Sequence, residues 1–137
     1  MIVDCVANSG ADLGPYRRGL FYTEETRFDL TVGKSYEVYA MALISGSLTV
    51  LVADEYDKPA WLPIELFEVR DPRVPDHWEF AKGEVGPNAP APGELICQAR
   101  WGYGEVVRSE IHYYGLEERD PEALRIFHEE RSRGSRD

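Results

Sequence analysis

The sequence lacks several features that would assign it to a protein class at once. It has two cysteines, Cys5 and Cys97, which are far apart and show no Cys-x-x-Cys spacing. They do not encode the disulfide framework of a small secreted protein, so we expect each to be a buried structural thiol. No apolar run approaches the ~20 residues of a membrane-spanning helix. The stretch "MIVDCVANSG" lacks the positive and apolar regions of a signal peptide, and we expect a cytoplasmic protein without a membrane partner.

Basic residues are scarce relative to acidic ones. The chain has 15 Lys and Arg against 25 Asp and Glu, for a net charge of −10, and residues 54–79 hold eight of the acids and three of the bases. Such a charge repels nucleic-acid phosphates and attracts basic proteins. We therefore predict no nucleic-acid partner. The alternative explanation is that the charge serves solubility alone.

The motifs of catalytic, metal and cofactor sites are also missing. His128-Glu129 begins like a zinc-protease helix, but Ser132 stands where the second histidine is required. Asp54 and Asp57 do not follow the ligand spacing of a calcium loop. There is no Gly-x-Ser-x-Gly elbow, and Gly102-x-Gly104 lacks the third glycine of a dinucleotide-binding turn. We predict no catalytic residue, no metal ligand and no cofactor.

What the sequence does contain is typical of one globular domain. Its 137 residues, 43% of them hydrophobic, fit a single domain over residues 1–137. Short strands joined by tight turns predict a mainly β (α+β) fold: a small SH3-like β-barrel or a strongly bent antiparallel sheet, with a short C-terminal helix. We place the barrel core at about 27–81, a loop at 82–93, and a C-terminal strand and helix at 94–131.

A β-hairpin is the best-defined element. Ser45-Gly46 is a two-residue turn between apolar strands, and it pairs Leu43 with Leu48, Met41 with Val50 and Tyr39 with Val52. Apolar residues occupy both parities of the first strand. This pattern predicts a strand that is covered on both faces.

The second half of the chain shows weaker signals. "IEL", residues 64–66, is expected to form one helical turn. Asp120 and Pro121 have the residue types of a helix start, which predicts a helix from this point whose apolar face docks onto the sheet. Residues 105–114 fit a strand or a short helix, and both alternatives stay open.

Four segments carry a resemblance to a known group. "LTVGKSYEVYAMAL", "DKPAWLPIELFEV", "HWEF" and "HYYGLEERDPEALRIF" resemble small bacterial proteins found among the immunity proteins of polymorphic or contact-dependent toxin systems. The resemblance covers about residues 27–81 and 110–128, and the Pro-rich stretch 84–93 departs from it. It implies a non-enzymatic inhibitor of a cognate toxin domain. It carries no contact residues across.

Charge and resemblance together give the predicted function: an immunity protein that binds and neutralises a basic, nuclease-type toxin domain. Trp61 is expected at the corner of the barrel, where it can also meet the partner. The alternatives are an SH3-like peptide- or ligand-binding regulatory module, and a small enzyme that uses His112 or His77. No oligomeric state is predicted. The acids could equally be solvated loop residues; the candidate partner-binding residues are Asp54, Glu55, Asp57, Trp61, Glu65, Glu117, Glu118 and Asp120.

Overall fold

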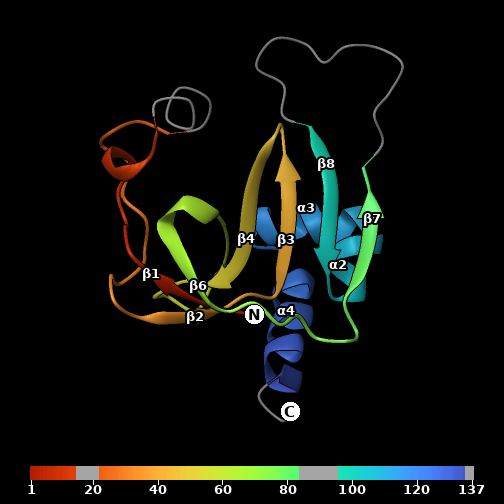
Figure 1. Ribbon diagram of the computed structural model, residues 1–137. Coiled ribbons are helices and arrows are strands. Elements are labelled where there is room, and N and C mark those ends of the chain that lie inside the picture. The colour runs from red at the N-terminus through yellow and green to blue at the C-terminus, as the bar shows by residue number, and fades with distance from the viewer. Residues whose placement is uncertain (15–21, 84–95, 135–137) are drawn as a thin grey trace.

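The computed structural model describes residues 1–14, 22–83 and 96–134. They form an α+β fold with two antiparallel sheets and three α-helices (Figure 1). The mainly β prediction with a C-terminal helix agrees with this arrangement. The predicted loop at 82–93 lies largely outside the described residues.

The smaller sheet has three strands with β1 in the centre. Its order is β2–β1–β6, with bounds Ser35–Glu37 for β2, Ile2–Cys5 for β1 and Phe67–Asp71 for β6. Val3 and Cys5 of β1 are buried, because alternate residues of a strand point to the same face. Two 3-10 turns adjoin this sheet: η1, Gly10–Asp12, follows β1, and η2, Ile64–Leu66, precedes β6. The predicted single helical turn at 64–66 is confirmed.

The larger sheet has five strands and holds the predicted hairpin. Its order is β5–β4–β3–β8–β7, with bounds Pro59–Pro63, Ser47–Ala53, Ala40–Ile44, Cys97–Gly102 and Glu79–Lys82. Leu43 pairs with Leu48 and Met41 pairs with Val50, so the predicted register is confirmed. Ser45 and Gly46 both have positive φ angles, 48° and 80°; this is the backbone twist that a tight hairpin requires.

Three helices pack against one face of the larger sheet; in Figure 1 α2 and α3 lie behind the strands and α4 extends below them. They are α2, Gly104–Arg108, α3, Glu110–Glu118, and α4, Pro121–Gly134. Residues 105–114, left open between strand and helix, are therefore helical apart from the Ser109 junction. The Ser109 side chain caps α3 by accepting a hydrogen bond from the backbone N–H of His112.

Strand β4 separates two hydrophobic cores. Val50 and Val52 pack between the sheets with residues of β1 and β6, whereas Leu51 faces the helices with Tyr103, Leu116 and Phe127 among others. All three β4 residues are fully buried. Cover on both faces is predicted for the first strand of the hairpin and is confirmed for part of it, because Ala40 of β3 packs in the core under the helices and Met41 packs against the core between the sheets.

Of the two predicted arrangements, a small SH3-like barrel or a strongly bent antiparallel sheet, the barrel is wrong for the described residues, which form two separate antiparallel sheets and no closed barrel. Strand β8 is the reason. It was expected outside a barrel core at 27–81, but it lies between β3 and β7 and pairs Met41 with Trp101 and Phe80 with Trp101. Strand partners so distant in sequence are selected by packing of the whole fold and not by the local pattern.

Among the described residues, no helix combines the length and apolar character needed to cross a membrane.

Candidate functional site

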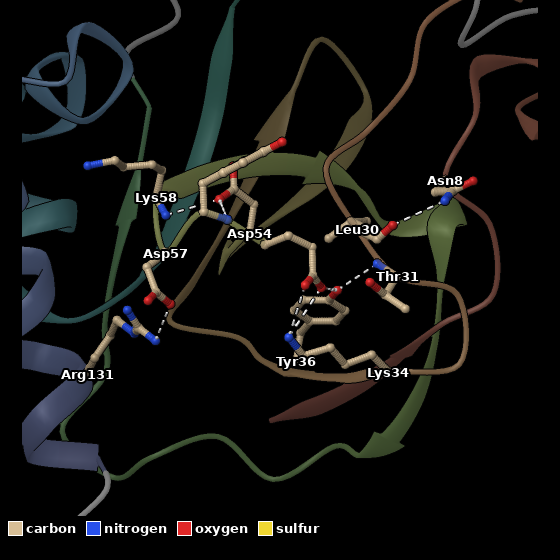
Figure 2. Close-up of polar contacts among 11 residues, drawn as sticks. Asn8, Leu30, Thr31, Lys34, Tyr36, Asp54, Asp57, Lys58 and Arg131 are labelled. Atoms are coloured by element: carbon tan, nitrogen blue, oxygen red, sulfur yellow. Dashed lines mark hydrogen bonds and ion pairs between the residues drawn. The ribbon is translucent and has the colours of Figure 1, made fainter.

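The first predicted acidic segment, Asp54 to Asp57, forms the turn between β4 and β5 (Figure 2). Asp54 is only 7% exposed. Its Oδ1 accepts hydrogen bonds from the backbone N–H groups of Tyr56 at 2.8 Å and Lys58 at 3.1 Å. Its carboxylate therefore closes the turn.

Glu55 is held by the side chains of Lys34 and Tyr36, which lie at the start of β2. The hydroxyl of Tyr36 donates a hydrogen bond to Oε1 of Glu55, and Nζ of Lys34 lies 3.2 Å from the same atom (Figure 2). The Tyr36 hydroxyl also accepts a hydrogen bond from the N–H of Thr31 at 2.8 Å. Burial and the neighbouring carboxylate raise the pKa of Tyr36 to about 12. The hydrogen bond from Tyr36, and then Lys34, lower the pKa of Glu55.

Asp57 connects the turn to the C-terminal helix. Its Oδ1 lies 3.3 Å from a guanidinium nitrogen of Arg131 in α4 (Figure 2). Its backbone is left-handed, with φ at 58°. All three acids of this segment thus have intramolecular partners, and two of them face a positive charge. The field that they offer to an external partner is reduced accordingly.

Trp61 packs between β5 and α3. Its ring lies 5.5 Å from the ring of Tyr113, so it joins the sheet to a helix instead of forming a barrel corner. The indole N–H is buried and has no hydrogen-bond partner among the described residues. Glu65 is exposed in η2.

The second predicted acidic segment joins α3 to α4. Glu117 and Glu118 are exposed in the last turn of α3, and no described basic side chain forms an ion pair with either. Asp120 has a structural task, because its Oδ2 accepts the backbone N–H groups of Glu122 and Ala123, both at 3.1 Å. The predicted helix start at Asp120 is confirmed. Glu117 and Glu118 oppose the negative end of the α3 dipole, where acids are unfavourable.

Two surface residues of α3 were missed by the sequence analysis. Ile111 is 88% exposed and Tyr114 is 54% exposed. They lie three positions apart and so occupy one side of the helix. The signal was hidden because residues 105–114 were not assigned to a helix, and only helical spacing brings these two side chains together.

Tyr103 and His112 form a buried, hydrogen-bonded pair of titratable side chains. The Tyr103 hydroxyl and Nε2 of His112 share a hydrogen bond of 2.7 Å, while the buried Nδ1 of His112 has no partner among the described residues. Burial lowers the pKa of His112, and Glu105 partly opposes this. His112 is 4% exposed, so a substrate has no direct access to it in this conformation.

No family model, curated protein sequence or solved structure matches this chain. Within the described ranges, no group of three or more His, Cys, Asp and Glu side chains is arranged to hold a metal ion.

Proposed function

We propose that this protein is a non-catalytic inhibitor that docks onto a basic protein, and that it serves as the immunity protein of a nuclease-type toxin domain. The observation that carries the proposal is the distribution of charge. Acids outnumber bases by ten, and intramolecular ion pairs engage Lys34, Arg70, Arg73, Arg100, Arg108, Arg125, Arg131 and Arg133.

The consequence is a surface whose uncompensated charge is negative. Because each ion pair engages charges of both signs, the excess of acids sets the long-range field. Such a field raises the rate at which a basic partner arrives and disfavours acidic competitors. An inhibitor of a toxin needs this property, since the toxin must be captured before it acts.

The buried position of His112 favours binding over catalysis. A general acid or base must come within hydrogen-bonding distance of the substrate. The imidazole of His112 lies in the core between the sheet and the helices, where Tyr103 already occupies its Nε2.

One observation favours the alternative of a peptide-binding module. Phe80 of the edge strand β7 is 56% exposed, and its ring lies 4.9 Å from that of Trp101. An exposed aromatic ring on the outer strand of a sheet, as β7 is among the described strands, is a feature of peptide-binding sheets. Lys82 lies two residues further along the same strand. The surface around Phe80 therefore does not share the acidic character of the C-terminal end of α3, where Glu117 and Glu118 lie.

The proposal is tested by co-expression with the C-terminal domain encoded by the gene directly upstream. We expect that domain alone to stop bacterial growth, and co-expression to restore growth and yield a 1:1 complex. The association rate constant should fall at least about tenfold when salt rises from low to several hundred millimolar, since salt screens the attraction. A different acidic protein of similar size is the control and should not restore growth. Cell death despite co-expression, with no complex on purification, contradicts the proposal.

A further inference from the structure

The outer side of α3 presents five residues to solvent, and one of them, Glu110, is paired with Arg100. The other four are Ile111, Tyr114, Glu117 and Glu118, whereas His112, Tyr113, Gly115 and Leu116 face the core. At 100° per residue these four side chains fall within one third of the helix circumference, with Tyr114 near the middle. We call these four residues the α3 face.

Tyr114 is held in place from below. Its ring makes an edge contact with Tyr113 at 5.3 Å. Tyr113 in turn lies 5.5 Å from Trp61, and the guanidinium of Arg100 covers its ring at 4.4 Å. Arg100 is anchored to the carbonyl of Val106 at 3.2 Å. An aromatic ring on such a platform loses little conformational entropy when a partner covers it.

The α3 face contributes little to the stability of the fold. Ile111 buries almost no surface and has a lower helix propensity than Ala or Leu. Glu117 and Glu118 oppose the helix dipole. An apolar and aromatic centre bordered by charged residues is the usual composition of a protein–protein interface.

The charge of the α3 face indicates its occupant. No described basic side chain forms an ion pair with Glu117 or Glu118, so a partner that covers them has to supply positive charge. In a symmetric dimer the same patch meets itself, so the charged residues of the face that one copy offers to the acids of the other are acids as well. Self-association through this face therefore supplies no compensating positive charge. A nucleic acid is excluded by the same sign of charge.

We propose that the α3 face is the docking surface for the basic partner: Ile111 and Tyr114 enter an apolar recess, and Glu117 and Glu118 meet Lys or Arg side chains at its border. This inference rests on the proposed function and assigns its binding surface. The proposed main contact therefore lies on α3 and not at the β4–β5 turn, whose acids already have partners within the molecule.

Photocross-linking locates the contact directly. A benzophenone amino acid replaces Ile111 in one variant and Phe80 in a second, and each is mixed with the purified C-terminal domain encoded upstream. We expect a 1:1 cross-link from position 111 and none from position 80. A complex that cross-links only from position 80 overturns the α3 face while leaving the proposed function standing. A cross-linked pair of copies of this chain from position 111 identifies self-association and overturns the basic partner. Absence of any complex removes both proposals.

Affinity measurements separate the contributions of the α3 face. Ile111→Ala combined with Tyr114→Ala should weaken binding at least about tenfold, as expected for residues at the centre of an interface. Phe80→Ala is the matched control, because Phe80 and Tyr114 are 56% and 54% exposed, and it should change the affinity less than about twofold.

Glu117→Gln with Glu118→Gln should slow association at low salt and leave dissociation nearly unchanged. Slower association in Glu55→Gln with Asp57→Asn, but not in the Glu117/Glu118 variant, would instead place the contact at the β4–β5 turn. Circular dichroism confirms that each variant is folded.

Discussion

The Tyr36 hydroxyl is the residue-scale link between three separate segments. It accepts from the Thr31 N–H, donates to Glu55 of the β4–β5 turn, and belongs to a ring that packs against Phe67 of β6 at 6.3 Å. These two hydrogen bonds connect residues that are not paired with each other in a β-sheet. The hydroxyl thus fixes the acidic turn relative to the smaller sheet.

Removing this hydroxyl should cost stability. Tyr36→Phe leaves the Thr31 N–H without this acceptor and removes one of the partners of Glu55, and we expect the free energy of unfolding to fall by about 1–2 kcal/mol. Urea denaturation measures the change. Tyr56→Phe is the control: Tyr56 is 70% exposed, and its change should stay within about 0.5 kcal/mol. Equal effects of the two substitutions would show that the Tyr36 hydrogen bonds do not stabilise the fold.

At the scale of elements, the junction between α3 and α4 ends one helix and caps the next within two residues. Arg119 ends α3 in the left-handed conformation, with φ at 59°, and Asp120 caps α4. Glu117 and Glu118 stand beside this junction without taking part in it. Stability and partner binding can therefore be separated by mutation at this point of the chain.

Two substitutions of Asp120 can separate an effect on stability from an effect on partner binding. Asp120→Ala removes the acceptor for two orphan N–H groups and should lower the free energy of unfolding by about 1 kcal/mol. Asp120→Asn keeps a capping oxygen and removes the charge, so the stability should stay nearly unchanged. Thermal or urea unfolding measures both variants, and binding of the partner is measured in parallel. If Asp120→Asn binds normally, the Asp120 charge has no part in docking, and only its capping role remains.

Whole-molecule stability should depend on pH in two steps. Burial lowers the pKa of His112 and of His128 in the folded state. A histidine of this kind binds its proton more readily when the chain is unfolded, so its contribution is complete above a pH of about 6.5 and is lost as the pH falls below that value. Hydrogen bonds to Tyr36 and Arg73 lower the pKa values of Glu55 and Asp71, and their contribution is lost below a pH of about 4.

Urea unfolding between pH 7.5 and 3 measures this profile. We expect the free energy of unfolding to decline first between pH 6.5 and 5 and again below pH 4.5. His112→Gln should reduce the first decline and preserve the second. His77→Gln, at a half-exposed side chain, should leave the His112 contribution in place. A free energy of unfolding that stays constant from pH 7.5 to 5 would contradict the assignment of the first decline to the buried histidines.

The sequence by itself determined the elements whose cause is local. The Ser45-Gly46 turn sets the register of β3 and β4 because a two-residue loop allows one pairing. Asp120 and Pro121 set the start of α4 because capping acts within one turn. The apolar residues on both parities of the hairpin required burial on two sides.

The tertiary structure decided what depends on distant neighbours. Residues 105–114 are helical because Val106, Val107 and Tyr113 pack in the core beside the sheet, and such packing overrides the β propensity of a Val- and Tyr-rich stretch. Strand β8 entered the main sheet, so no barrel closed. Glu55 and Asp57 found Lys34 and Arg131, which lie 21 and 74 positions away in the chain. Local sequence patterns determine turns, strand registers and helix starts. The tertiary neighbours of a segment are determined by the burial of the whole chain, and those neighbours decide which acids remain available to a partner.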